Sequence, residues 1–219
     1  MNIFIHDWKD SYTEVDFPMN TIKSQRYLPA QLTHPRVQRG YLPNGTAGTR
    51  RTLELMVNLI REGARDFYVR QAAIDILLNS AVPAKAYLEE IETLFRWVQR
   101  NIRYTKDPYR SELLTSALRI LQLRIGDCDD MTVLLGAMLE SIGHPVRIVV
   151  AGYRRDKPGL FSHVYLEVYY QGRCIPLDPT MSYPMGWEAP WAIRAMMPIH
   201  NYNIVVPTFK GCCSHLKEK

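Results

Sequence analysis

The 219-residue sequence has few cysteines, no long apolar run and no start typical of a secreted protein. Its four cysteines, at positions 128, 174, 212 and 213, lack the even spacing of a disulfide framework, which predicts free thiols in a reducing compartment. The longest apolar runs, such as VRIVVAG at 146–152, are too short to cross a bilayer. The opening MNIFIHDWKD contains acidic residues and no apolar block before a cleavage site, so we expect neither a signal peptide nor membrane insertion.

The charge is basic but not concentrated. The formal net charge is +5 and the pI is near 9.0, yet the lysines and arginines are scattered instead of forming a stripe with interleaved aromatics, which disfavours nucleic-acid binding. Cys212, Cys213 and His215 near the C-terminus lack the spacer and the second ligand pair of a structural zinc site. We therefore expect no metal and no other cofactor.

The chain divides by its pattern of prolines and apolar residues. Residues 1–48 carry Pro18, Pro29, Pro35 and Pro43 without a sustained period, which predicts an extended N-terminal arm held by the domain, another copy or another protein. Residues 49–219 are predicted to form one domain. Its last part, 181–219, is rich in aromatics and proline and is expected to wrap the sheet.

Helices are predicted first and strands second. Apolar stripes at helical spacing occur at 53–60, at about 65–79 and at 88–102, and Ser111 is predicted to cap a helix carrying Leu114, Leu118 and Leu121. After Gly143 the segments VRIVVAGY, HVYLEVYY and RCIPLD are β-branched and aromatic. This order predicts an α+β fold in which a helical half packs on an antiparallel sheet.

Cys128, in RIGDCDDM, begins a strongly helical pattern. Met131, Leu135, Met138 and Ile142 share its side of the helix, and Gly143 with Pro145 is predicted to end it. The unpaired N–H groups and the helix dipole favour a thiolate at this position, whereas the neighbouring carboxylates oppose one. A small buried hydrophobe is the alternative interpretation. A nearby imidazolium would lower the thiol pKa, so the question is which histidine lies close.

His163 is the histidine that the strand pattern selects. His144 lies beyond the far end of the helix, about 24 Å from the thiol. His6, His34, His200 and His215 fall in the arm or the tail. If Gln171 and Gly172 form a two-residue turn, Val168 faces Ile175 and Leu166 faces Leu177, which makes one face of the hairpin apolar.

The same register puts His163 and Asp178 together on the other face, as diagonal neighbours. Glu167 and Tyr169 share that face and are interpreted as solvent-facing. A thiol, an imidazole that moves its proton and a carboxylate that orients the imidazole form the usual set for nucleophilic catalysis. Cys128, His163 and Asp178 are therefore the predicted catalytic residues.

At these residues the chain resembles the transglutaminase-like superfamily. The resemblance rests on FRWVQRNIRYTKDP, GDCDDM, GHPVRIVVAGY and SHVYLEVYYQGRCIPLDPT, which span about 85–180. It implies a papain-like α+β core with a Cys-His-Asp triad. The earlier helices and GWEAP are similar to members encoded by tailed phages and prophages.

The resemblance also bears on the transition state and on the reaction. It implies an aromatic hydrogen-bond donor at Tyr104, which can form an oxyanion hole with the Cys128 backbone N–H. Papain-like spacing offers Gln122 as the rival. Asp129 stands where animal cross-linking enzymes have tryptophan, so transamidation, proteolysis and amide hydrolysis all stay open.

Two functions follow as expectations. The first is a thiol acyltransferase or hydrolase that acts on peptide or amide substrates, in a host cytoplasm or a virion. The alternative is a structural or assembly protein of a phage virion that binds neighbouring phage proteins, or copies of itself, through its arm and tail.

Overall fold

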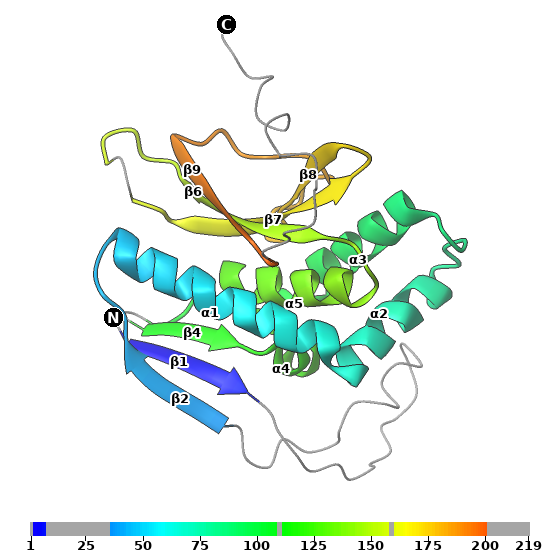
Figure 1. Cartoon of the computed structure of the whole chain (residues 1–219), viewed down its shortest axis with the longest axis horizontal. Helices are drawn as coiled ribbons and strands as arrows, with labels where there is room; N and C mark the ends of the chain where they lie inside the picture. The colour runs from blue at the N-terminus through cyan, green and yellow to red at the C-terminus, as the bar shows by residue number, and fades with distance from the viewer. Residues whose placement is uncertain (1, 8–35, 109–110, 158–159, 201–219) are drawn as a thin grey trace, which may run out of the picture.

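The computed structural model describes residues 2–7, 36–108, 111–157 and 160–200. Its centre is α5 (Cys128–Ser141), which lies between a four-stranded sheet and the remaining helices (Figure 1). Every residue from 129 to 139 is buried. Sequence periodicity indicated one buried face, but helices cover one side of α5 and strands cover the other, so no face meets solvent.

Four helices pack around α5. They are α1 (Thr46–Arg65), α2 (Phe67–Asn79), α3 (Tyr87–Asn101) and α4 (Ala117–Leu123). The predicted stripes are buried at Leu53, Met56, Val57 and Ile60 of α1 and at Ile91, Phe95 and Val98 of α3. Asp66 caps α2 by accepting hydrogen bonds from the N–H groups of Tyr68 and Val69. The helical half of the prediction is therefore present.

The predicted helix beginning at Ser111 is wrong in its first part. Residues Ser111–Thr115 form β4, which pairs in parallel with β1 (Asn2–Asp7). The helix starts only at Ala117, after Ser116. Pairing with a strand more than a hundred residues away overrides the local helical spacing, as tertiary context commonly does.

The four-stranded sheet has the order β8-β7-β6-β9 and is antiparallel throughout. Its strands are β6 (Val146–Gly152), β7 (His163–Tyr170), β8 (Arg173–Leu177) and β9 (Ile193–Pro198). The predicted hairpin register is confirmed, since Leu166 pairs with Leu177 and Tyr170 with Arg173. Gln171 and Gly172 turn the chain with φ of 46° and 78°, as a two-residue hairpin requires. The α+β class is confirmed.

Two smaller sheets complete the described fold. β1 joins β2 (Arg36–Tyr41) to β4, and β3 (Arg103–Tyr104) pairs in parallel with β5 (Ile125–Gly126). Residues 8–35 of the predicted arm lie outside the described residues, as do 201–219 with Cys212, Cys213 and His215. The division of the chain at residue 48 stays a prediction. Among the described helices, none combines the length and apolarity needed to cross a membrane.

Candidate active site

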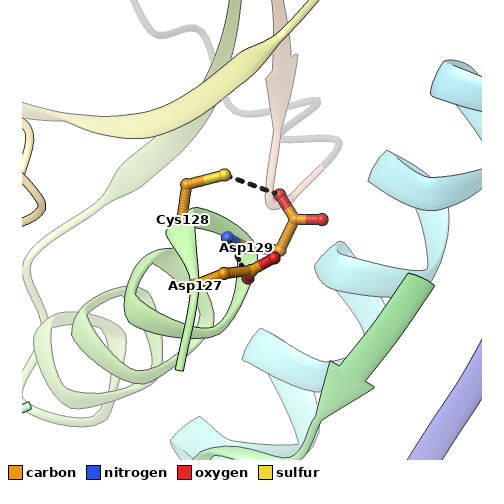
Figure 2. A group of neighbouring side chains, drawn as sticks. All are labelled: Asp127, Cys128 and Asp129. Carbon is orange, nitrogen blue, oxygen red and sulfur yellow. Dashed lines mark hydrogen bonds between the residues drawn. The ribbon is translucent and has the colours of Figure 1, made fainter. Parts of the chain in front are cut away.

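Cys128 is the first residue of α5, and its position is set by the residue before it. Asp127 adopts an extended conformation and accepts hydrogen bonds from the N–H groups of Asp129, at 3.0 Å, and Asp130, at 3.3 Å. Figure 2 shows the hydrogen bond between Asp127 and Asp129. The cap satisfies two of the N–H groups that a helix start leaves unpaired. This places the first residue of α5 at Cys128, directly before Asp129 and Asp130.

The thiol lies against the beginning of β7. Its sulfur donates to Asp129 Oδ1 at 3.6 Å (Figure 2), and the backbone N–H of Val164 donates to the sulfur. One turn further along α5, Thr132 Oγ1 donates to the Val164 carbonyl at 3.4 Å. The backbone N–H and the carbonyl of Val164 therefore both contact the start of α5. The residue immediately before Val164 is His163.

His163 and Asp178 are in direct contact, as the hairpin register predicted. The imidazole Nε2 lies 2.7 Å from Asp178 Oδ2. Asp178 Oδ1 accepts the Thr180 hydroxyl at 2.6 Å and the Thr180 N–H at 3.1 Å. Both carboxylate oxygens are thus engaged, and the Asp178 side chain is only 5% exposed. A carboxylate held in this way fixes the orientation of the imidazole through Nε2, so Nδ1 is the ring nitrogen left for proton exchange.

The protonation of the thiol differs from the sequence-based expectation. Burial raises the pKa of the Cys128 thiol, the charges of Asp129 and Asp127 raise it further, and the Val164 N–H lowers it. An imidazolium was expected to bring the pKa down, but removal of the sulfur from water outweighs the favourable contacts. The Cys128 side chain is therefore a neutral thiol, which would need a base to accept its proton if it acted as the predicted nucleophile.

Tyr104 lies on a short strand that pairs with the residues just before the thiol. β3 pairs Tyr104 with Gly126, and the Thr105 N–H donates to the Gly126 carbonyl at 2.8 Å. Burial raises the pKa of Tyr104 to about 12, and Cys128 contributes the largest of the charge effects. The phenol is therefore neutral near Cys128 and can donate a hydrogen bond there.

Gln122, the rival to Tyr104, is on the last turn of α4. Its amide nitrogen and oxygen are both buried and make no hydrogen bond within the described part of the chain. No interaction among the described residues joins it to Cys128. The choice between Tyr104 and Gln122 as the oxyanion donor stays a prediction.

Tyr153 is a site residue that the sequence analysis missed. It follows the last residue of β6, and its ring centroid lies 6.2 Å from that of His163. Burial raises its pKa to about 12, with further contributions from the charges of Asp178, Glu188 and Cys128. The register could have found it, because Ala151 pairs with His163 and Tyr153 is the next residue on the same face.

Glu167 is not solvent-facing, which corrects the earlier interpretation. Its side chain is 4% exposed and lies between two arginines. Arg147 on β6 contacts it at 2.5 Å, and Arg194 on β9 contacts it on the other side. The strand β9 comes from the C-terminal part of the chain and pairs with β6. This pairing brings Arg194 to Glu167 and shields the carboxylate from water.

Glu188, in the segment GWEAP, is fixed to the strand that carries the histidine. Its carboxylate accepts a hydrogen bond from the Tyr165 hydroxyl and another from Trp191 Nε1 at 3.2 Å, and it pairs with Arg194 at 3.1 Å. Tyr165 in turn stacks on the His163 ring, with centroids 6.0 Å apart. The segment before β9 is therefore linked to His163 through Tyr165, which contacts both Glu188 and the imidazole.

Several carboxyl groups surround the start of α5. Burial raises the pKa of Asp127 to about 6 and that of Asp130 to about 8, and it raises the pKa of Asp129 well above its usual range. Side-chain ligand atoms of Asp127, Cys128 and Asp129 lie within 4.8 Å of one another, close enough to share a cation (Figure 2). Asp130 also accepts the Thr115 N–H at 3.0 Å, so it has a structural role in joining α5 to β4.

Comparison with known proteins gives one family match, and the similarity to solved structures is weak. Residues 77–179 match the family model described as the transglutaminase-like superfamily. A candidate cysteine protease from Cytophaga hutchinsonii is 18% identical, with a TM-score of 0.42, over 64% of this chain and 51% of its own. A candidate protease from Parabacteroides distasonis is 15% identical, with a TM-score of 0.47, over 73% of this chain and 32% of its own.

A third similar structure is calcium-bound LapG from Legionella pneumophila, which is 21% identical with a TM-score of 0.42 over 60% of this chain and 75% of its own. The chain thus spans about half the length of the Cytophaga protein and about a third of the Parabacteroides protein. A comparison with curated proteins found no match.

Proposed function

We propose that this chain, whose residues 77–179 carry a transglutaminase-like superfamily core, is a cysteine-dependent enzyme that transfers acyl groups from peptide or other amide substrates. Cys128 is the nucleophile, His163 the general base and acid, and Asp178 the residue that orients His163. The observation that carries the proposal is the 2.7 Å contact between His163 and Asp178 on a strand whose next residue, Val164, holds the Cys128 thiol.

Acylation begins with a neutral thiol. Because Nε2 of His163 is engaged by Asp178, Nδ1 accepts the proton as the Cys128 sulfur attacks the substrate carbonyl carbon. The carbonyl oxygen becomes an oxyanion, which the Tyr104 hydroxyl and the Cys128 backbone N–H stabilise. The carbon–nitrogen bond then breaks, His163 returns the proton to the departing amine, and a thioester on Cys128 remains.

Deacylation follows the same chemical steps with a second nucleophile. Water or an amine attacks the thioester carbon while His163 takes its proton, the carbon–sulfur bond breaks, and the proton passes to the sulfur. Water yields hydrolysis and an amine yields transamidation. Both use the same residues, so the choice between them depends on which acceptor reaches the thioester.

The test is the formation of a covalent intermediate on one named cysteine. Purified protein mixed with p-nitrophenyl acetate should show a burst of p-nitrophenol and an intact-mass increase of one acetyl group. Cys128→Ala should abolish both, whereas Cys174→Ala, at the other described cysteine, should retain them. Acetylation that persists in Cys128→Ala would refute the assignment. Incubation with glutamine-containing peptides and a primary amine then separates amine adducts from cleaved or deamidated products.

The structural or assembly function expected as the alternative depends on the N-terminal arm and the C-terminal tail. Much of both lies outside the described residues, and no observation on the described ones favours it. The acyl-transfer proposal therefore stands alone.

A further inference from the structure

The imidazole of His163 lies between two tyrosine rings at the start of β7. Tyr165, two residues along β7, stacks on it at 6.0 Å with an interplanar angle of 26°. Tyr153 lies one step beyond His163 in the opposite direction, because Ala151 pairs with His163, and its ring is 6.2 Å away at 38°. The histidine therefore has one tyrosine on either side along the strand direction.

The two tyrosines differ in what else they contact. Tyr165 is 2% exposed, and its hydroxyl donates to Glu188, so it closes one side of the imidazole. Tyr153 is 37% exposed, and its hydroxyl makes no hydrogen bond within the described part of the chain. A small molecule that reaches His163 from solvent therefore approaches on the Tyr153 side.

The backbone that carries Tyr153 is held firmly. A Cβ atom on Gly152 would lie 2.2 Å from the Leu160 carbonyl oxygen, so only glycine fits there. The Gly152 carbonyl accepts the Ala192 N–H at 2.8 Å, and the preceding carbonyl, of Ala151, accepts the Ser162 N–H at 2.9 Å. A residue on such a constrained strand end can present its hydroxyl in one place, which a role in positioning a substrate group requires.

The charges of Cys128 and Asp178 raise the pKa of both Tyr153 and Tyr104, but their relative size differs. For Tyr104 the largest charge effect comes from Cys128, whereas for Tyr153 the effects of Asp178 and Glu188 exceed that of Cys128. By strand pairing Tyr104 lies beside Gly126, two residues before Cys128, whereas the ring of Tyr153 lies beside that of His163. In acyl transfer the oxyanion develops beside the nucleophile, while the attacking water or amine exchanges its proton with the imidazole.

We propose that Tyr153 is a substrate-contacting residue that orients the acyl acceptor during deacylation, an inference that rests on the proposed function. The attacking water or amine carries two hydrogens. His163 takes one as the new bond to the thioester carbon forms, and the Tyr153 oxygen accepts a hydrogen bond from the other. Because the phenol is neutral, it directs the acceptor without competing for the proton.

The experiment separates acylation from deacylation with p-nitrophenyl acetate. Its leaving group departs as a stable phenolate and needs no proton from His163, so the burst rate reports attack by Cys128. The later steady state reports attack on the acetyl-enzyme by water or by added methylamine. Tyr153→Phe should leave the burst rate within about twofold of wild type and slow both deacylation reactions about tenfold, the effect of one lost hydrogen bond.

Two matched variants complete the design. Tyr104→Phe should slow the burst and the steady state together, since an oxyanion forms in both. Tyr41→Phe, at an 88% exposed tyrosine, should change neither. Thermal melts of the three variants check that the fold is retained.

The outcomes distinguish the two proposals. Unchanged deacylation in Tyr153→Phe, or an equal loss in burst and steady state, would overturn the role of Tyr153 while leaving the acyl-enzyme intact. A wild-type protein without a Cys128-dependent burst would instead refute the proposed function, and the role of Tyr153 would fall with it.

Discussion

Replacement of Glu167 by alanine should destabilise the fold far more than an ordinary surface substitution. The carboxylate is 4% exposed and pairs with Arg147, 14% exposed, and Arg194, 15% exposed. Removing one partner of a buried ion pair leaves an uncompensated charge and costs about 3–5 kcal/mol. Against a total stability of about 5–15 kcal/mol, this is a large fraction. For a protein of this size the melting temperature should fall by roughly 6–20 °C.

Urea unfolding followed by circular dichroism measures the effect, and the chain offers a matched control. Glu54 also pairs with two arginines, but the pairs are exposed, so Glu54→Ala should cost no more than about 1 kcal/mol. Glu167→Leu combined with Arg147→Met should recover most of the loss, because the Arg147 charge is removed and Arg194 keeps Glu188 as its partner. A Glu167→Ala variant as stable as Glu54→Ala would show that the buried pairing is not what holds β6, β7 and β9 together.

Three further predictions concern single groups. Thr180→Val removes the hydroxyl that donates to Asp178 at 2.6 Å but keeps the side-chain volume. The rate of the burst should fall about tenfold, while the melting temperature changes little. An unchanged burst would show that the Thr180 backbone N–H alone holds the carboxylate. The folded pKa of Asp130 is raised to about 8 from 3.8, so the folded state holds a proton that the unfolded chain releases; its contribution to stability is full below about pH 4 and is lost as the pH rises to about 8. Urea midpoints at pH 5 and pH 8 should differ less in Asp130→Asn than in wild type, and an equal difference would contradict the shift. Gly63→Ala places a Cβ atom 2.7 Å and 2.8 Å from two alanine Cβ atoms where α1, α4 and α5 meet, and the crowding should outweigh the gain in helix propensity by about 1 kcal/mol in a thermal melt; a higher melting temperature would show that the helices separate easily.

The parts of the site that could be predicted depend on short-range patterns. The start of α5 at Cys128 follows from an apolar helical stripe preceded by a capping aspartate, and both features lie within fifteen residues. The contact between His163 and Asp178 follows from one turn and the alternation of two strands. Such local patterns determine the register of a hairpin, because the turn and the alternation of apolar residues bring its two strands together without help from the remaining chain.

The parts that could not be predicted depend on segments distant in sequence. Ser111–Thr115 becomes a strand because β1 lies beside it, and Glu167 is buried because β9 brings Arg194 to it. The raised pKa of the Cys128 thiol has the same origin, since its main cause is burial by packed elements rather than any neighbour in the sequence. Tyr153 ends the predicted segment VRIVVAGY, but its place beside His163 depends on the pairing of β6 with β7, across a loop whose length and path the local pattern does not determine.

The alternation of core residues and site residues along β7 limits where the chain can change in length. Even-numbered positions such as Val164, Leu166 and Val168 are buried against the helices, while odd-numbered positions carry His163, Tyr165 and Glu167. A one-residue deletion between His163 and the turn would move the residues before it to the other face, which takes the imidazole away from Asp178 and into the core. Insertions in the loop after Tyr153 leave that phase intact. Variation in length should therefore accumulate between β6 and β7 and be absent from the eight residues of β7 itself.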